Sequence, residues 1–196
     1  CPTGAIVLRN NTAGVWKALD DKEVRVSAQI APAVRVAIGK ELGIADGENA
    51  MGKIVAAMRR MGFNEIFDTS TGADLTVLEE STEFLEHLEH EEAKMPLFTS
   101  CCPAWISYCE KNDPDLLPYI STCRSPMQMF ASVIKEHHKM SKRKHVHVAV
   151  MPCTAKKYEA ARNEFKKNGS SNVDFVLTTQ ELIQMIKESG LVFSEL

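Results

Sequence analysis

Two stretches of the chain share one plan, in which a short apolar run leads through proline and cysteine into a helical pattern. The first is Met95-Pro96-Leu97-Phe98-Thr99-Ser100-Cys101-Cys102-Pro103, and the second is Val146 to Met151 followed by Pro152-Cys153-Thr154. Each predicts a strand that ends where a helix begins, with thiols at the junction. Backbone N–H groups at a helix start favour negative charge, so thiolates there suit metal ligation or proton chemistry.

The adjacent thiols of the first stretch are expected to do different work. Neighbouring side chains in an extended segment point in opposite directions, so Cys101 and Cys102 are not expected to serve one small site in the same way. One is expected to be a metal ligand and the other a free thiol. The plain alternative is a buried structural cysteine, since free Cys is among the most buried residue types. That interpretation is kept for Cys109 and Cys123.

The composition fits one soluble globular domain with a substantial core. The chain has 196 residues, of which 44% are hydrophobic and 25% charged, and a net charge of −3. This charge gives no reason to expect nucleic acid or a membrane surface as a partner, and no apolar run is long enough to cross a bilayer. Six cysteines without the spacing of a secreted disulfide framework favour metal chemistry in a reducing, cytoplasmic compartment.

Strand and helix patterns alternate along the chain. Strands are predicted over 6–8, 23–30, 65–68, 97–98, 146–151 and 173–177. Helices are predicted over 12–19, 34–42, 48–61, 71–91, 103–111, 126–138, 154–166 and 178–188, the last capped by Thr178. This alternation predicts an α/β fold with a mainly parallel sheet flanked by helices, and such sheets carry their sites at the carboxyl ends of the strands.

TSCCPAW followed by MPCTAKKYE, with CPTGAI at the start, resembles the catalytic domain of the iron-only ([FeFe]) hydrogenases. The resemblance implies a two-lobed domain, of which residues 11–196 are the N-terminal part, covering the first lobe and part of the second. It also implies that residues 1–10 are the tail of a ferredoxin-like [4Fe–4S] module, with Cys1 as a metal ligand. Taken alone, Cys1 is more often a surface cysteine before a turn than a cluster ligand.

The resemblance assigns roles to residues of both motifs. Cys102 and Cys153 would ligate the [4Fe–4S] cubane of the H-cluster, whose two-iron subcluster carries CO, cyanide and a bridging dithiolate amine. Cys101 would be the free thiol that exchanges protons with that amine. Lys156 would donate to a cyanide, and Glu159 is expected on the same helix face, three residues further on. Lys157 is expected to be solvated.

Further residues are expected to line the pocket of the two-iron subcluster. Met151 would pack against it, and Ala31-Pro32-Ala33 matches the segment that wraps the distal iron. This chain has Ala33 where many members have Ser, Met127 where many have Gln, and PAW in place of PGW. These departures bear on the tuning of the distal iron.

A row of titratable groups on the long helix predicts a proton path. Glu80, Glu83 and His87 follow at i, i+3 and i+7, and so share one face. The resemblance implies that Glu80, Ser121 and Glu83 carry protons between Cys101 and solvent. The alternative is a solvated acidic face. The apolar residues of the same helix predict a buried side that some carboxylates border; they are Leu75, Leu78, Leu85 and Leu88.

The implied function is the reversible reduction of protons to dihydrogen, with electrons from ferredoxin or a similar carrier and with cluster maturation proteins as further partners. The alternatives are a non-catalytic iron–sulfur assembly or Narf-like relative and a hydrogen-sensing hydrogenase. A [4Fe–4S] cluster generally takes four cysteines, and the implied cubane has two in this chain. We therefore expect a Cys-x3-Cys motif beyond Leu196, and a chain that is inactive by itself.

Overall fold

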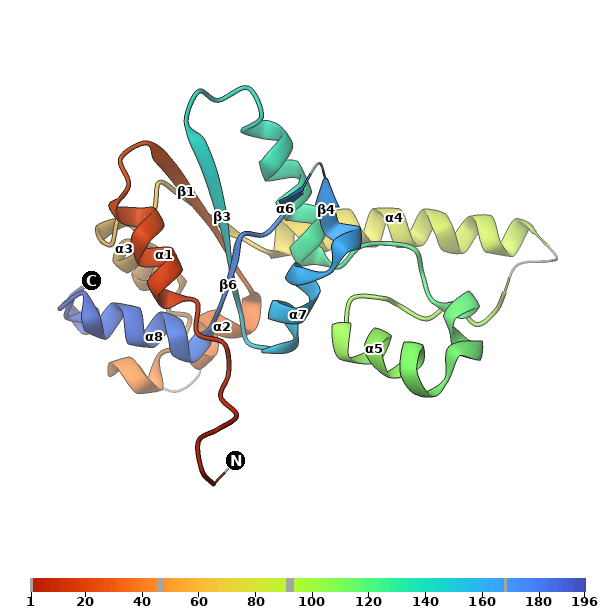
Figure 1. The fold of residues 1–196 in the computed structure, drawn as a ribbon, viewed down its shortest axis with the longest axis horizontal. Coiled ribbons are helices and arrows are strands. Elements are labelled where there is room, and N and C mark those ends of the chain that lie inside the picture. The colour runs from red at the N-terminus through yellow and green to blue at the C-terminus, as the bar shows by residue number, and fades with distance from the viewer. Residues whose placement is uncertain (1, 46–47, 91–93, 168) are drawn as a thin grey trace.

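A four-stranded parallel sheet forms the centre of the molecule (Figure 1). The computed structural model describes residues 2–45, 48–90, 94–167 and 169–196. The strands are β1 (Val24–Ile30), β2 (Glu65–Asp68), β3 (Lys144–Met151) and β6 (Phe175–Thr178), in the order β2-β1-β3-β6, and all neighbours pair in parallel. The predicted α/β class with a mainly parallel sheet is confirmed.

Helices cover both faces of this sheet. Figure 1 shows α1 (Thr12–Asp20), α3 (Met51–Arg60) and α8 (Thr179–Glu188) on one side, and α4 (Ser70–Glu89), α6 (Pro126–His137) and α7 (Ala155–Ala161) on the other. The predicted cap of α8 is confirmed, since Thr178 and Glu181 form a reciprocal capping box. No described helix combines the length and the apolar composition that a bilayer crossing needs.

Two predicted helices are shorter than expected. The helix predicted over 34–42 is α2 (Pro32–Ala37) followed by a separate 3-10 turn at Lys40–Leu42, which ends at Gly43 with a φ of 79°. The helix predicted over 154–166 ends at Ala161, and a 3-10 turn (Asn163–Phe165) leads into the small hairpin of β4 (Lys166–Lys167) and β5 (Ser170–Ser171). The predicted end of the long helix at 91 lies outside the described residues.

Two predicted strands are not part of the sheet. Ile6, Val7 and Leu8 are exposed and pair with no strand among the described residues. The run at 97–98 makes only an isolated parallel bridge between Phe98 and Ile120, remote from the four-stranded sheet. Both runs are apolar but too short to bury a face of their own. The second run leads into a helical lobe built on α5 (Pro103–Asn112), which lies apart from the sheet (Figure 1).

Helix α4 packs on α6 only near its beginning. Gly72 and Thr76 are its buried residues, and a Cβ atom at Gly72 would lie 2.3 Å from the carbonyl oxygen of Pro126 on α6. The predicted buried side further along the helix is wrong for the described chain, where Leu78, Leu85 and Leu88 are 67%, 59% and 59% exposed. The reason is visible in Figure 1, where α4 runs out past the edge of the sheet toward the α5 lobe.

The sheet interior contains polar residues that the sequence pattern does not reveal. Ser27 and Gln29 of β1 are fully buried on the face opposite Val26, Ala28 and Ile30. Four hydrogen bonds connect Thr69 Oγ1 to Gln29 Oε1 (3.1 Å), Gln29 Nε2 to His147 Nε2 (2.9 Å), His147 Nδ1 to Ser27 Oγ (2.7 Å) and Ser27 Oγ to His145 Nε2 (2.8 Å).

The protonation of this chain of groups follows from its partners. Gln29 Nε2 also donates to the carbonyl oxygen of Met127 at 3.0 Å, so the amide nitrogen is a donor and His147 Nε2 must accept. His147 Nδ1 then carries the proton and donates to Ser27, whose hydroxyl donates to His145. Both imidazoles are therefore neutral. Burial, assisted by neighbouring cationic groups, lowers the pKa of His145 and of His147 to about 3.

We expect the free energy of unfolding to fall as the pH drops below 6.5, the pKa of an unfolded histidine. The unfolded state binds protons that folded His147 excludes, so its contribution is complete above pH 6.5 and is lost progressively toward pH 3. At pH 5 the loss from His147 is on the order of 2 kcal/mol. Urea unfolding at pH 7.5 and pH 5 measures this loss of unfolding free energy. Most carboxylates titrate below pH 5 and so contribute little to the difference.

The matched variants are His147→Gln and His90→Gln, the second at an exposed position. His147→Gln should reduce the dependence of stability on pH, with His145 still contributing, and His90→Gln should leave it as in the parent. Equal slopes for the parent and His147→Gln would show that the buried histidine does not cause the acid sensitivity.

Candidate functional site

The carboxyl ends of β1 and β3 bring one set of predicted site residues together. Ile30 pairs with Val150, and the backbone N–H of Ala31 donates to the carbonyl oxygen of Val150 at 3.0 Å. Ala31 and Met151 are buried, whereas Pro32 and Cys153, which follow them along their segments, are exposed. The strand register thus places the Ala31-Pro32 segment beside the Met151-to-Cys153 segment at one edge of the sheet.

The adjacent cysteines Cys101 and Cys102 lie at the start of helix α5. Cys102 precedes Pro103, the first helical residue, and has an extended conformation with φ −97° and ψ 108°. Cys101 and Cys102 are free and exposed, as is Cys153. The expected helix start is confirmed, but the preceding residues are not a strand of the main sheet. This motif therefore depends on contacts between lobes for its position.

Lys156 makes the contact that joins the two cysteine motifs. Its Nζ donates to the carbonyl oxygen of Cys101 at 2.7 Å and to Glu159 Oε2 at 2.6 Å. Ser125 Oγ donates to the other carboxylate oxygen of Glu159. The side chains of Lys156 and Glu159 are only 14% and 6% exposed. The helix that follows Cys153 is thereby tied to the backbone of Cys101.

Glu83 and Ser121 are in direct contact, as the predicted proton path requires. Ser121 Oγ donates to Glu83 Oε2 at 2.5 Å, and the N–H and hydroxyl of Thr122 donate to Glu83 Oε1 at 2.8 and 2.9 Å. Burial raises the pKa of Glu83, but these hydrogen bonds and the nearby His87 outweigh it, so the net pKa lies below the ordinary value of 4.5. Glu83 is therefore ionised at neutral pH.

Glu80 lies close to this pair without bonding to it. Its Oε1 is buried and has no hydrogen-bond partner among the described residues. Glu80 and Ser121 line one cavity of about 420 Å³, to which Thr99, two residues before Cys101, also contributes. A cavity of this size has room for water beside the Glu80 and Ser121 side chains. A step from Glu80 to Ser121 would thus pass through a water molecule.

The donor set fits part of an iron–sulfur site. Thiolates suit iron–sulfur clusters, and the described residues offer exposed, unpaired cysteines on both motifs. Among these same residues no group of three or more His, Cys, Asp or Glu side chains could hold a metal by itself. Cys102 and Cys153 would therefore be a partial ligand set. Cys1 lies outside the described residues.

Several residues near the site have surroundings that sequence patterns do not reveal. Ser125 is the N-cap of α6, as its place before Pro126 indicates. Its hydrogen bond to Glu159 has no signal in the neighbouring sequence. Cys123 is half-buried, and burial together with Glu80 and Glu83 raises the pKa of its thiol. Lys157 is not solvated as expected, since its ammonium pairs with Glu181 at 2.6 Å.

We expect Lys156→Ala to lower the free energy of unfolding by about 3 kcal/mol, because it leaves the buried Glu159 carboxylate without its cationic partner. Lys139→Ala is the matched control. It breaks another lysine–glutamate pair three residues apart, Lys139 with Glu136, whose side chains are 63% and 65% exposed. This control should change stability by less than about 0.5 kcal/mol. Urea unfolding of both variants measures these changes. Similar losses of unfolding free energy in the two variants would contradict a stabilising role for the buried Lys156–Glu159 pair.

Comparison with known proteins agrees with this geometry. The family model described as "Iron only hydrogenase large subunit, C-terminal domain" matches residues 24–196. The chain is 45% identical over 205 residues to the NADP-reducing hydrogenase subunit HndD of Solidesulfovibrio fructosivorans, covering 100% of this chain and 35% of that protein. It is 43% identical over 187 residues to the periplasmic [Fe] hydrogenase large subunit of Nitratidesulfovibrio vulgaris, covering 93% and 44%.

A second kind of relative is more distant. The cytosolic iron-sulfur assembly component 3 of Bos taurus is 33% identical over 189 residues, covering 91% of this chain and 40% of that protein. The chain thus spans less than half the length of these three relatives. Among solved structures, a variant of the [FeFe]-hydrogenase HydA1 from Chlamydomonas reinhardtii has a TM-score of 0.87 at 40% identity, covering 96% of this chain and 49% of that one. The chain therefore belongs to the iron-only hydrogenase large-subunit family.

Proposed function

We propose that this chain is part of an [FeFe]-hydrogenase that reversibly reduces protons to dihydrogen with electrons from ferredoxin or a similar one-electron carrier. The observation that carries the proposal is the bond of Lys156 to the Cys101 carbonyl oxygen, which brings the Cys101-Cys102 motif to the helix that follows Cys153. Family membership supports the class of cofactor, and the three exposed thiols supply chemistry for it.

The proposed cofactors are a [4Fe–4S] cluster and a two-iron subcluster with CO, cyanide and a bridging dithiolate amine. Cys102 and Cys153 would hold the cubane, and Cys1 would ligate a separate N-terminal cluster. When bound, the H-cluster supplies the redox chemistry in which protons and electrons combine. Ala31, Pro32 and Met151 would form the wall beside it. Lys156 would hold the Cys101-Cys102 motif through its bond to the Cys101 carbonyl oxygen and present its remaining ammonium proton to an anionic ligand.

The protein's own part in the reaction would be the movement of protons. Cys101 Sγ would hold a proton beside the bound cofactor, because its neighbour Cys102 is the ligand. From there Glu80, Ser121 and Glu83 would pass protons toward solvent, with water between Glu80 and Ser121. The short Ser121–Glu83 bond and the ionised state of Glu83 support the outer half of this path.

An iron–sulfur assembly function is the second candidate, favoured by the similarity to the bovine assembly component. The family resemblance implies that relatives of that kind lack the free thiol and the Met-Pro-Cys-x-x-Lys pattern. Cys101 and Lys156 favour the hydrogenase. A sensory hydrogenase would share all these residues and differ in its use of the product.

The partners and compartment follow from the proposed reaction. Ferredoxin would deliver electrons, and maturation proteins would insert the two-iron subcluster. We place the protein in the cytoplasm because its thiols suit a reducing environment. The relative from Nitratidesulfovibrio vulgaris is named as periplasmic, which is the competing assignment. Fractionation of the source cells would test the assignment.

The two adjacent thiols should respond differently to substitution in the intact protein. Cys102→Ala should lose cluster iron, because a ligand is gone. Cys101→Ala should keep its iron but lose most hydrogen evolution, because only the proton-holding group is gone. Iron content and hydrogen evolution from reduced viologen are measured for both under anaerobic conditions. Equal loss of iron in the two variants would contradict the division of roles.

The proton path makes a separate prediction. Glu80→Gln and Glu83→Gln should each slow hydrogen evolution on the order of 100-fold, because an amide cannot carry the proton. The infrared bands of CO and cyanide should stay normal, since neither residue is a ligand. Glu86→Gln, an exposed position on the same helix, is the control and should behave as the parent. If all three variants evolved hydrogen as fast as the parent, the proposed proton path would be wrong and these carboxylates would be only a solvated acidic face.

A further inference from the structure

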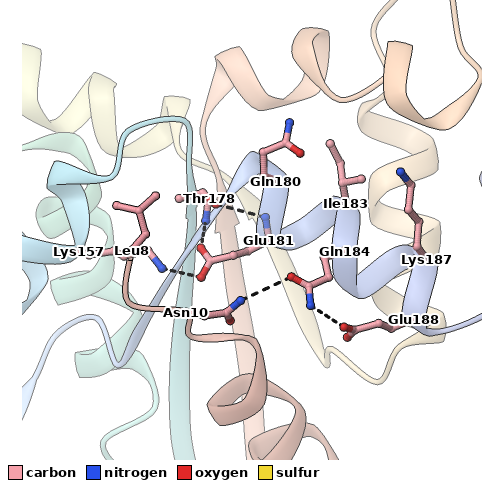
Figure 2. Close-up of a pocket in the computed structure, with 10 residues that line it drawn as sticks. All are labelled: Leu8, Asn10, Lys157, Thr178, Gln180, Glu181, Ile183, Gln184, Lys187 and Glu188. Atoms are coloured by element: carbon pink, nitrogen blue, oxygen red, sulfur yellow. Dashed lines mark hydrogen bonds and ion pairs between the residues drawn. The ribbon is translucent and has the colours of Figure 1, made fainter. Parts of the chain in front are cut away.

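The cavities of the described chain differ in what their charged side chains face. In the cavity of about 480 Å³ beside α8, shown in Figure 2, Lys157 Nζ donates to Glu181 Oε1 at 2.6 Å and to the carbonyl oxygen of Arg9 at 2.7 Å. Gln184 donates to Glu188 there at 2.6 Å. These contacts pair the polar groups with one another and join the N-terminal segment to α7 and α8, which makes this cavity a structural junction.

A cavity of about 630 Å³ beside α4 is different, because a row of titratable side chains lines it. The members of this row on α4 are Glu79, Glu83, Glu86 and His87, and the segment 122–124 supplies another part of the lining. Glu83 is the member that also bonds to Ser121, on the proposed proton path. The residues that hold Glu83 therefore bear on how that path meets this cavity.

Thr122 holds one oxygen of Glu83 with two donors. Its backbone N–H donates to Glu83 Oε1 at 2.8 Å, and its hydroxyl donates to the same oxygen at 2.9 Å. The other oxygen, Oε2, accepts the hydroxyl of Ser121. A carboxylate held at both oxygens cannot rotate about its last bond without breaking these hydrogen bonds, so Thr122 sets which oxygen faces Ser121. We call the two donors of Thr122 the clamp.

The hydroxyl of Ser121 is oriented by its other neighbours. It accepts the backbone N–H of Cys123 at 3.1 Å and donates to Glu83 Oε2. One lone pair of its oxygen then remains for a water molecule from the Glu80 side. A proton can pass from that water to Ser121 Oγ while the original hydroxyl proton leaves Ser121 for Glu83 Oε2. This transfer requires a carboxylate that is ionised and turned correctly, and the clamp supplies the orientation.

The segment that carries Thr122 is tied to the chain just before the cysteine motif of α5. The backbone N–H of Ser121 donates to the carbonyl oxygen of Phe98 at 2.7 Å, and the hydroxyl of Ser100 donates to the carbonyl oxygen of Cys123. These two bonds flank Thr122 along the chain, so its backbone is held on both sides while its side chain is exposed. The clamp is thereby fixed relative to the cysteine motif.

We propose that Thr122 is a positioning residue for proton transfer, which holds the Glu83 carboxylate so that Oε2 receives the proton of Ser121. This rests on the proposed function, in which Ser121 and Glu83 carry protons. Thr122 gives up no proton in the transfer, because it donates to Oε1 and the proton arrives at Oε2. Both of its hydrogen bonds can persist when Glu83 is protonated, but they are stronger to the ionised carboxylate. The clamp therefore favours the form of Glu83 that can receive a proton.

The effect of the clamp can be separated from that of the charges around Glu83. The titratable and charged groups that share its cavity are Glu79, Glu86, His87, Cys123 and Arg124. Glu80 lines the neighbouring cavity with Ser121. Burial raises the pKa of Glu83, and the hydrogen bonds from Ser121 and Thr122, together with His87, lower it to a net value below the ordinary 4.5. Removing the Thr122 hydroxyl leaves every one of these charged groups in place.

The test uses the intact protein with its clusters. In Thr122→Val the hydroxyl is replaced by a methyl group, so the ratio of protonated to ionised Glu83 at pH 5 should rise about tenfold, because a hydrogen bond to a charged group is lost. Infrared spectroscopy measures this ratio from the carbonyl stretch of protonated Glu83, assigned by its absence in Glu83→Gln. Thr122→Ser keeps the hydroxyl and should restore the parental ratio. Thr82→Val is the matched control, since Thr82 lines the same cavity but donates to the carbonyl oxygen of Leu78 at 2.9 Å.

The second measurement is hydrogen oxidation with oxidised viologen, in which Glu83 must be ionised to receive a proton. The rate at pH 5 relative to the rate at pH 7 should fall about twofold in Thr122→Val, and should match the parent in Thr122→Ser and Thr82→Val. An unchanged infrared ratio in Thr122→Val would overturn the clamp. A raised infrared ratio with an unchanged pH dependence would overturn the role in proton transfer. A parent protein with its cluster iron but without hydrogen turnover would overturn the proposed function, and the positioning role with it, whatever the infrared result.

Discussion

The parallel pairing of β1 with β3 is the constraint on which the rest of the molecule depends. Seven register pairs run from Val24 with Lys144 to Ile30 with Val150. Because these central strands are buried on both faces, a slip of one residue would turn Ser27 and Gln29 toward apolar neighbours and break their bonds to the histidines of β3. The register is therefore held by polar contacts as well as by backbone bonds, and it sets where both strands end.

The cysteine motif of α5 is positioned by different forces. It lies outside the main sheet, and charged side chains from the α7 region reach across to it. Lys156 binds the Cys101 backbone, and the guanidinium of Arg162 makes two bonds to Glu110 of α5, at 2.5 and 3.1 Å. Bidentate pairs of this kind define orientation as well as distance. The candidate site thus joins an apolar sheet edge to a lobe held by a few directional bonds.

Local signals in the sequence were enough for the order of the four sheet strands and of the helices α1 to α8, for the Thr178 cap and for the two cysteine motifs. They failed where the deciding partner is distant along the chain. Alternation in β1 identified the face of Val26 and Ala28, but could not show that Ser27 is also buried, since its partner His147 is 120 residues away. Lys157 looked solvated because Arg9 and Glu181, which bind it, have no local relation to it. The apolar residues of α4 predicted a buried side that requires a covering layer, and the described residues do not provide one there.

Gly72 has no reactive side chain, yet its close packing against α6 affects the position of Glu83 on the proposed proton path. At this point α4 touches the backbone of α6, where even a methyl group would collide with Pro126. Glu83 lies eleven residues further along the same helix, about 16 Å from that contact. A change in the tilt of α4 at Gly72 therefore displaces residues in proportion to their distance from it. A tilt of about 5° at the pivot moves the Glu83 carboxylate by roughly 1.4 Å, which is more than a hydrogen bond to Ser121 tolerates.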